Sequence, residues 1–255
     1  MNRTHAVIAL ASVAAARGLD EDLAPLDTAL REAGLDVRIV DWDDPAVDWA
    51  GFDAVLLRST WDYTERLVEF LDWCAKVSAV TTLLNPLDVV CWNTDKHYLA
   101  DLGNTGIAVV ESFFVETGDD AAGFPDHAEF VVKPCVGAGS RDTQRYLRAE
   151  REAAIAHVRR LIDAGRAVLV QPYLSGVDAD GETALLFFAK ARCCAVAKAR
   201  RRSCSRPNTS PPGFRRMPNT PWPDACWRQC RSARWPMPAS TCCPRPMARA
   251  CWNWN

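Results

Sequence analysis

Residues 130–140 read Phe-Val-Val-Lys-Pro-Cys-Val-Gly-Ala-Gly-Ser. The apolar start predicts a buried strand over residues 130–133, which delivers Lys133 into a loop of small residues. Backbone N–H groups in such a loop can turn inward on an anion, so we expect the loop and Lys133 to hold a phosphate. The expected phosphate-binding loop residues are Gly137, Ala138, Gly139 and Ser140. The loop lacks the G-x-x-x-x-G-K-[ST] order of a Walker A motif, and a hairpin turn with a surface lysine is the alternative.

A second candidate segment follows an apolar run at residues 168–170. This run predicts a buried strand that ends in a polar residue and a proline. A strand end of this kind can offer backbone donors and acceptors to an adenine ring, and Asp178 could accept hydrogen bonds from ribose hydroxyls. The expected adenine-binding residues are Gln171, Pro172, Tyr173 and Leu174. The alternative is an ordinary strand end followed by a turn.

A third candidate segment, residues 58–63, reads Arg-Ser-Thr-Trp-Asp-Tyr and directly follows a predicted strand at residues 54–57. In open α/β sheets, ligands bind beyond the carboxyl ends of the strands. An arginine, two hydroxyls and a carboxylate suit a substrate that carries both a carboxylate and an amine, so we assign Arg58, Ser59, Thr60 and Asp62 to substrate. The alternative is a capped helix start with Arg58 in a surface ion pair.

A fourth candidate is Lys96, in the segment Trp-Asn-Thr-Asp-Lys-His-Tyr-Leu at residues 92–99. We expect a helix over residues 96–102 with Lys96 at its start. There the lysine and the positive helix end could face a phosphate together. A solvated lysine is the alternative, and we expect His97 to lie on the surface.

Apolar runs and helical periodicities alternate along the first part of the chain. We expect strands at residues 6–10, 37–40 and 54–57, with helices at 23–33 and 67–77. This alternation predicts an open, parallel α/β sheet for residues 1–85. Gly34 is the expected C-terminal stop of the first helix. Further strands are expected at residues 113–115, 130–133 and 168–170.

The near-neutral net charge of −2 hides two different compositions. Residues 1–188 hold 16 basic and 31 acidic side chains, whereas residues 189–255 hold 14 basic side chains and the single acid Asp224. Those last 67 residues also contain 8 of the 11 cysteines and 10 of the 16 prolines, but no leucine or isoleucine. Such a segment has no apolar face to bury, so we expect no helix or strand within it.

Three interpretations of residues 189–255 compete. A zinc or disulfide module is disfavoured because the cysteine spacings do not fit and the segment has no histidine. A basic nucleic-acid-binding arm would use the arginines to neutralise phosphates, although the prolines and cysteines are unusual for such an arm. We favour translation in a shifted frame. Read one nucleotide earlier, residues 250–255 give Leu-Leu-Glu-Leu-Glu when the free base is C or T, which is an alternating strand pattern.

Taken in order, the motifs at residues 58–63, 85–86, 92–96 and 132–140 resemble the ATP-grasp superfamily. They are similar to its cycloserine-biosynthesis branch, that of the O-ureido-D-serine cyclo-ligases. The resemblance implies an α/β fold, with a Rossmann-like pre-ATP-grasp domain at residues 1–85 and an ATP-binding ATP-grasp region at 86–188. Residues 189–255 would then be a frameshifted tail, with the C-terminal lobe lost or out of frame. The resemblance also implies that Lys96 and Lys133 contact ATP phosphates.

The implied chemistry is an ATP- and Mg²⁺-dependent ligation that forms an amide-type C–N bond, or a ring, on an amino-acid-like substrate through an acylphosphate. The family holds magnesium with a late Glu-x-Glu-type motif, and no such motif follows Glu182 in this chain. We therefore expect no metal ligands and an inactive chain. The rival interpretations are a non-catalytic nucleotide-binding remnant and a nucleic-acid-binding protein with a basic tail. We expect a cytoplasmic protein without nucleic-acid partners. We also expect no membrane partner, since no run of about 18 apolar residues occurs.

Overall fold

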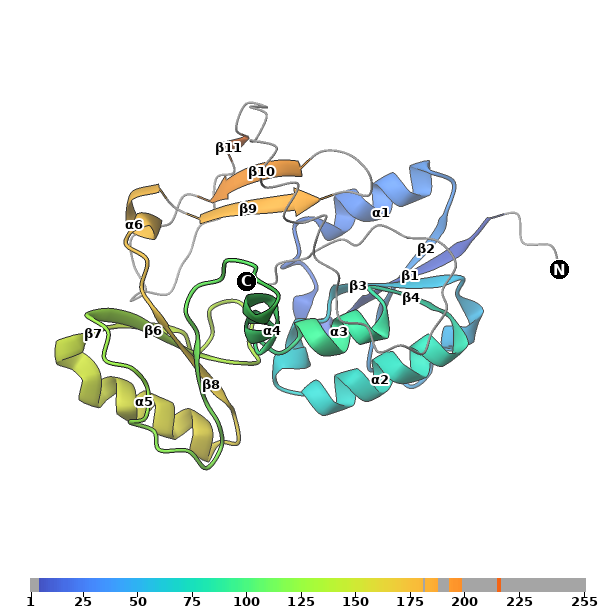
Figure 1. The fold of residues 1–255 in the computed structure, drawn as a ribbon. Helices are drawn as coiled ribbons and strands as arrows, with labels where there is room; N and C mark the ends of the chain where they lie inside the picture. The colour runs from blue at the N-terminus through green and yellow to red at the C-terminus, as the bar shows by residue number, and fades with distance from the viewer. Residues whose placement is uncertain (1–4, 181, 188–192, 199–214, 217–255) are drawn as a thin grey trace. The chain divides into compact units, whose positions relative to one another are not determined.

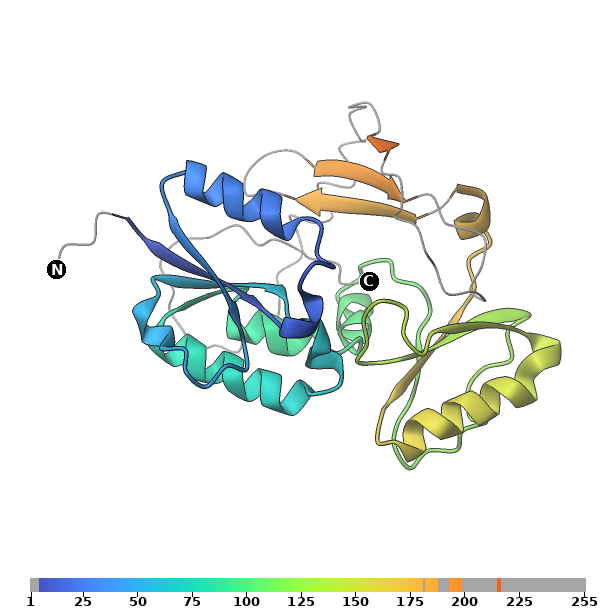
Figure 2. The same cartoon turned by 180° about the vertical axis from the view of Figure 1, so that it is seen from behind.

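The computed structural model describes residues 5–180, 182–187, 193–198 and 215–216. The chain divides into two compact units, Met1–Asp95 and Lys96–Asn255. Figure 1 and Figure 2 show the elements of each unit from two opposite sides. The domain boundary predicted after residue 85 lies ten residues earlier than this division. Helix α3 (Leu87–Asn93) packs against α2 (Leu67–Val80) and therefore goes with the first unit.

The first unit is a parallel sheet with strand order β2-β1-β3-β4. Its strands are β1 (Val7–Ser12), β2 (Asp36–Asp41), β3 (Ala54–Ser59) and β4 (Thr82–Leu84). Helix α1 (Leu23–Glu32) connects β1 to β2, and α2 connects β3 to β4 in the opposite direction along the sheet. Because both crossovers of a parallel sheet are right-handed, the two helices cover opposite faces, as Figures 1 and 2 show. The predicted parallel α/β fold is confirmed.

Aromatic side chains fill the core on the α2 side of this sheet. Helix α2 buries Phe70, Trp73, Cys74 and Val77, the i, i+3, i+4 and i+7 positions of one helical face. The indole of Trp42, which follows β2, meets Phe70 and Trp73 edge-on, with ring centroids 5.5 and 5.7 Å apart. Aromatic pairs prefer this geometry, so the helix and the strand ends are fixed to one another.

Gly34 ends the helical turn of α1 as predicted. Its φ of +84° is accessible to glycine at no steric cost. The N–H of Gly34 donates to the carbonyl of Arg31 at 2.9 Å, and the N–H of Leu35 donates to the carbonyl of Leu30 at 3.1 Å. These two bonds form a Schellman motif, which directs the chain out of the helix and into β2.

The second unit is built on an antiparallel sheet with strand order β5-β8-β6-β7. Its strands are β5 (Phe113–Val115), β6 (Glu129–Pro134), β7 (Gln144–Leu147) and β8 (Val168–Pro172). The strands expected at residues 113–115, 130–133 and 168–170 are therefore confirmed, whereas β7 was not predicted. Helix α5 (Arg151–Asp163) covers one face of the sheet, and the short helices α4 (Tyr98–Asn104) and α6 (Gly176–Asp180) lie in the connections.

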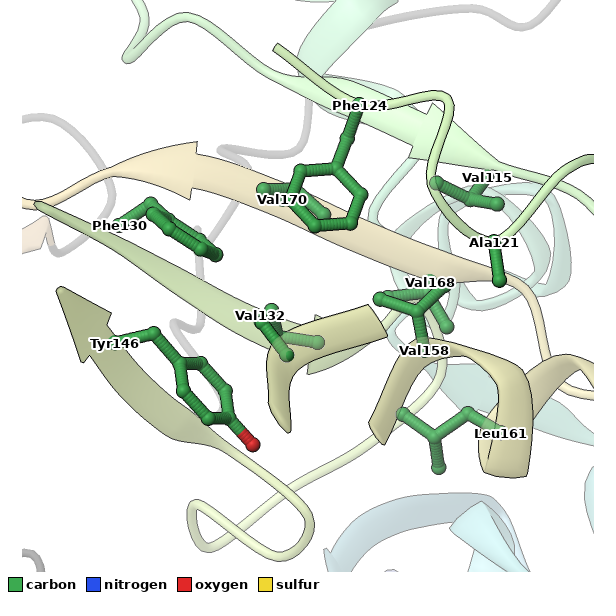
Figure 3. Packing of buried hydrophobic residues seen from close by; sticks show 11 residues of the cluster. Val115, Ala121, Phe124, Phe130, Val132, Tyr146, Val158, Leu161, Val168 and Val170 are labelled. Atoms are coloured by element: carbon green, nitrogen blue, oxygen red, sulfur yellow. The ribbon is translucent and has the colours of Figure 1, made fainter. Parts of the chain in front are cut away.

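One apolar cluster joins α5 to the sheet (Figure 3). The helix contributes Ala154, Val158 and Leu161, each with no measurable solvent exposure. The strands contribute Phe130 and Val132 from β6, together with neighbours on the same face. Because side chains alternate along a strand, burial of these two residues directs Val131 and Lys133 to the other face of the sheet.

The helix expected around residues 96–102 is present as α4, but it begins two residues later than expected, so Lys96 does not lie at its start. Helix α3 ends at Asn93, α4 begins at Tyr98, and Lys96 lies in the turn between them. The N–H of Lys96 donates to the carbonyl of Cys135 at 3.0 Å. This bond fastens the turn to the end of β6, so Lys96 is positioned by the sheet and not by a helix end.

A second antiparallel ladder involves part of the segment in which no strand was expected. Strand β9 (Glu182–Phe187) pairs with β10 (Cys193–Lys198), which in turn pairs with β11 (Arg215–Arg216). The expectation is therefore wrong for these residues, because backbone pairing with β9 supplies a ladder that the side-chain pattern does not reveal. The remainder of the predicted tail lies outside the described residues. Among the described helices, none is long and apolar enough to cross a membrane.

Helix α5 buries a histidine in the core. His157 is 8% exposed, and its Nδ1 lies 3.1 Å from the hydroxyl of Tyr146. Burial lowers the pKa of His157 below its usual 6.5 and raises the pKa of Tyr146. The imidazole is therefore neutral, and its Nδ1 shares a hydrogen bond with the tyrosine hydroxyl.

The buried His157 predicts a loss of stability in mild acid. Below about pH 6.5 the unfolded chain takes up a proton that the folded core excludes, so the free energy of unfolding falls as the pH drops from about 6.5 towards the lowered pKa of the folded state. In His157→Gln this part of the pH dependence should disappear, as measured by urea unfolding between pH 8 and pH 5. The exposed His5→Gln is the matched control and should keep it. An unchanged slope in His157→Gln would contradict the assignment.

Candidate nucleotide and substrate sites

The candidate nucleotide site lies on the face of the four-stranded sheet opposite α5, which we call the Lys133 face. In the antiparallel register, Lys133 pairs with Leu169 and Val131 pairs with Gln171. Directly opposite residues of paired strands share a face, so Lys133 and Gln171 lie on the same side of the sheet. The register thus brings together two predicted residues that are 38 positions apart in the sequence.

Gln171 is held in a fixed orientation on this face. The side chain is 9% exposed, and its Nε2 donates to the hydroxyl of Ser112 at 2.8 Å. Ser112 in turn donates to the carbonyl of Val110 at 2.9 Å. These two hydrogen bonds fix the orientation of the Gln171 side-chain amide and thus the position of its oxygen. Ser112 was not predicted, because its role depends on a neighbour 59 residues away.

The glycine loop leaves β6 beside Lys133. A Cβ at Gly137 would lie 2.9 Å from the Cγ of Pro134, so the backbone passes the proline ring closer than any other residue allows. Gly139 has a φ of +63° and open space where a Cβ would stand, and Ser140 follows with a φ of +58°. Two successive left-handed residues form a tight turn, and the N–H of Arg141 closes it by donating to the carbonyl of Ala138 at 3.3 Å. This turn joins the paired strands β6 and β7, as the predicted hairpin alternative requires. N–H groups of a turn can also bind an anion, and the assignment of this loop to phosphate stays a prediction.

Lys96 lies against the beginning of the same loop. Its ammonium group donates to the carbonyl of Gly137 at 2.9 Å and to the carbonyl of Cys135 at 3.2 Å. These bonds place Lys96 beside the glycine loop, and its assignment to ATP phosphates stays a prediction. Beside it, His97 stacks on Phe114 with ring centroids 4.2 Å apart, and its Nε2 lies 2.8 Å from Glu116 Oε1.

The segment after β8 is fastened to the first residue of β6. The N–H of Tyr173 donates to the carbonyl of Glu129 at 2.9 Å, which continues the strand ladder by one step. Pro172 pairs with Phe130, and Leu174 is 51% exposed. The segment therefore has backbone polar groups at the end of a strand next to an exposed apolar side chain. Such a combination suits the polar edge and the apolar face of an adenine ring.

Asp178 accepts hydrogen bonds from two side chains, those of Tyr173 in the hinge segment and of Arg145 in β7. The hydroxyl of Tyr173 donates to one carboxylate oxygen at 2.6 Å, and Arg145 Nη1 donates to the other at 2.8 Å. The Arg145 guanidinium also stacks over the Tyr173 ring, 3.5 Å from its centroid, and bonds to the Glu129 carboxylate. The bond to Glu129 raises the pKa of Arg145. Arg145 was missed by sequence reasoning, and the ribose assignment of Asp178 stays a prediction.

The candidate substrate site lies at the carboxyl edge of the parallel sheet in the first unit. Arg58 Nη2 donates to Asp20 Oδ1 at 2.6 Å and to Asp22 Oδ2 at 3.3 Å. The hydroxyl of Ser59 also bonds to the Asp20 carboxylate. Asp20 follows β1, whereas Arg58 and Ser59 end β3, so the pair spans the point where the strand order reverses. Ligands of open α/β sheets bind at this switch point.

Buried polar atoms surround this pair. Ser59 and Thr60 are at most 1% exposed, as is Ser12 at the end of β1. The hydroxyl of Ser12 and the Nε of Arg58 have no hydrogen-bond partner among the described residues. Buried polar groups are costly without partners, so their presence at a ligand-binding edge is consistent with contacts to a bound molecule. Asp20 and Ser12 were not predicted, since each contributes only through pairing of β1 with β3.

Asp62 occupies a different environment from the other predicted substrate residues. Its Oδ1 accepts the indole N–H of Trp42 at 2.9 Å, and its Oδ2 lies 3.0 Å from Arg66 Nη1. Both oxygens thus stabilise the packing of η3 (Trp61–Thr64) and α2. This environment supports the structural alternative for Asp62.

The described residues do not fit a magnesium ion. Mg²⁺ requires carboxylate oxygens that are free to coordinate it. Around the Lys133 face the carboxylates of Glu129 and Asp178 are both paired with Arg145. In the part of the chain that the structure describes, no three carboxylates are gathered in the geometry of a metal site.

Solved structures place this fold in the ATP-grasp class. The crystal structure of D-cycloserine synthetase DcsG matches with a TM-score of 0.71 and 42% identity, covering 75% of this chain and 67% of that chain. A RimK domain ATP-grasp protein from Sphaerobacter thermophilus matches with a TM-score of 0.51 at 21% identity, over 66% and 64% of the two chains. D-alanyl-alanine synthetase A from Vibrio cholerae matches with a TM-score of 0.61 at 10% identity, over 90% and 79%. The last two likenesses concern the fold alone.

Sequence comparison narrows this class to one family. Residues 8–85 match the model of the N-terminal domain of the D-cycloserine synthetase DcsG. The cycloserine biosynthesis protein DcsG of Streptomyces lavendulae is 44% identical over 190 residues, which are 71% of this chain and 64% of the relative. The chain belongs to the DcsG family of ATP-grasp proteins. It spans just under two thirds of the length of that curated relative.

Proposed function

We propose that this protein is the nucleotide-binding part of an ATP-dependent ligase that acts on an amino-acid-like substrate. The observation that carries the proposal is the common placement of Lys133 and Gln171 on one face of the sheet, beside a glycine loop with left-handed backbone. A strand lysine next to the N–H groups of a tight turn suits a triphosphate, and the hinge after Gln171 suits a purine ring.

Each residue of the proposed site has a positional role. Lys133 and Lys96 neutralise phosphate charge from the sheet and from the adjoining turn. The loop of Gly137, Ala138, Gly139 and Ser140 surrounds the phosphates with N–H donors. The hinge residues Gln171–Leu174 hold the adenine, with Asp178 near the ribose. These groups orient and stabilise the nucleotide, while the bond-making chemistry takes place between ATP and the substrate.

For the reaction, we propose attack of a substrate carboxylate on the γ-phosphorus of ATP. The bond between that phosphorus and the bridging oxygen breaks, which releases ADP and leaves an acylphosphate. An amine then displaces phosphate, so that a C–N bond or a ring forms. The cycloserine biosynthesis protein that is 44% identical to this chain supports this substrate class. Arg58, Ser59 and Thr60 at the sheet edge are the proposed substrate residues of this chain.

We further propose that the 255-residue chain does not complete this reaction. Magnesium in such enzymes neutralises the charge of the transferred phosphoryl group, and the described carboxylates do not fit the ion. A shift of reading frame after Lys198 accounts for both the composition of residues 199–255 and the lost Glu-x-Glu motif. The two nucleotide lysines precede this point, so a nucleotide-binding remnant is the second candidate function.

An ADP-release assay tests the proposed function. The chain as written and a chain recoded in the shifted frame after Lys198 are each given ATP, Mg²⁺ and a series of D-amino acids, including O-ureido-D-serine. We expect substrate-dependent ADP release from the recoded chain only. Release by the chain as written would refute its inactivity. Failure of both chains, together with failure of either to bind ATP, would refute the ligase assignment.

A further inference from the structure

The far end of the glycine loop is held by an ion-pair cluster that the proposed function has not used. Asp142 Oδ1 lies 3.0 Å from Arg160 Nη2, and its Oδ2 lies 2.6 Å from Arg166 Nη1. The carboxylate is thus bridged by two guanidinium groups, and its side chain is 24% exposed. The hydrogen bond from Arg166, followed by the bond from Arg160, lowers the pKa of Asp142 below its usual range.

The two arginines come from a rigid part of the unit. Arg160 lies in the last turn of α5, next to Leu161, which is completely buried against the sheet. Arg166 lies in the connection to β8, and its own N–H donates to the carbonyl of Leu161 at 3.0 Å. Because the helix is anchored by its apolar face, the guanidinium groups occupy defined positions, and Asp142 is fixed to them.

The loop needs an anchor because its backbone is strained. Asp142 has a φ of +55° and Ser140 a φ of +58°, and neither is a glycine. Each such residue costs of the order of 1 kcal/mol and persists only when its surroundings enforce the conformation. At its beginning the loop is held by Lys96, which bonds to the carbonyl of Gly137. At its end it is held by the ion pairs of Asp142 with Arg160 and Arg166.

We propose that Asp142 is a positioning residue for the triphosphate: its ion pairs with Arg160 and Arg166 keep the glycine loop in the left-handed conformation that turns its N–H groups toward phosphate. The inference rests on the proposed nucleotide site. Asp142 does not contact the nucleotide in this account. It acts through the backbone of Gly139 and Ser140, which lie between the two anchored ends in the turn that Arg141 N–H closes by donating to the carbonyl of Ala138.

A second, electrostatic effect of Asp142 would change ATP affinity in the opposite direction. The sign of the measured change in affinity therefore tests the proposal. The carboxylate also neutralises two arginines near a loop that would bind an anion. If neutralisation were its main effect, removing the charge would strengthen phosphate binding through the released guanidinium groups. If positioning dominates, removing the charge weakens binding because the loop loses its conformation. The two effects change the dissociation constant of ATP in opposite directions.

The test compares Asp142→Asn with wild type in titrations of ATP and of adenosine, followed by isothermal calorimetry. Asparagine tolerates the left-handed region, so the substitution removes the charge with little intrinsic backbone penalty. We expect the dissociation constant of ATP to rise about three- to tenfold, the range of a charged hydrogen bond on a partly exposed site. Adenosine, which lacks phosphates, should bind equally well to both proteins. A general structural defect would weaken both ligands.

Two further measurements complete the test. In nucleotide-free protein, amide hydrogen exchange of residues 137–143 should be faster in Asp142→Asn than in wild type. Asp126→Asn is the matched control, since Asp126 forms an exposed ion pair with Arg148 at 3.2 Å and should leave ATP affinity unchanged. Equal or tighter ATP binding by Asp142→Asn would overturn the positioning role alone. Absence of ATP binding by wild type would overturn the nucleotide site and this inference with it.

Discussion

Replacement of Lys133 by methionine is expected to weaken ATP binding about 30- to 100-fold. Lys133 lies at the start of the glycine loop on the same face as Gln171, where its ammonium group would meet the phosphates. Loss of a charged hydrogen bond in a partly buried site costs about 2–3 kcal/mol, which corresponds to that factor. Methionine keeps the length and apolar stem of lysine, so β6 should remain paired. The dissociation constant is measured by calorimetric titration of ATP.

The control for Lys133 is Lys76→Met, an exposed lysine on α2 of the first unit. It removes the same charge from the molecule, and ATP affinity should stay within about twofold of wild type, because the charge of an exposed side chain outside the proposed site is weakened by solvent and salt. A loss of affinity in Lys76→Met equal to that in Lys133→Met would mean that net charge, and not the position of Lys133, governs binding.

Replacement of Leu161 by alanine is expected to lower the free energy of unfolding of the second unit by about 2–5 kcal/mol. Leu161 is completely buried in the cluster that joins α5 to β6 and β8 (Figure 3). Truncation removes apolar contacts and leaves a cavity that the packed neighbours cannot fill. Alanine is a good helix former, so the loss reports packing and not helix propensity. Urea unfolding followed by circular dichroism measures the change.

Leu147→Ala provides the matched comparison for Leu161. Leu147 ends β7 in the same unit and is 52% exposed, so the same truncation there should cost well under 1 kcal/mol. If both variants lost similar stability, the cluster beneath α5 would not be the core that supports the Lys133 face.

The sequence predicted those parts of the fold that depend on local patterns. The apolar run Phe130–Val132 before Lys133 predicted the strand β6, and the structure confirms it. Helical spacing in α2 predicted its buried face. Gly34 predicted the end of α1 because the left-handed region favours glycine. In each case the residues that determine the feature lie within a few positions of one another, so the local sequence is enough to predict it.

The remaining parts depend on residues that are distant in sequence. Asp20 meets Arg58 only because β1 and β3 are neighbours in the sheet, and Arg145 meets Asp178 only because β7 pairs with β6. Lys96 was assigned to a helix start because the charge fitted a helix dipole, whereas a bond to Cys135 fixes it in a turn. Registers of this kind are set by tertiary pairing, which single-sequence periodicity does not encode.

The central claim is that the Lys133 face binds ATP, with the purine at the segment following β8. Photolabelling with an azidoadenine analogue of ATP, followed by peptide mapping, tests it most directly. The account predicts that the label enters the peptide containing Gln171–Leu174 and that excess ATP, but not phosphate alone, prevents it. Labelling within residues 1–95, or labelling of the hinge peptide that ATP does not reduce, would contradict the account.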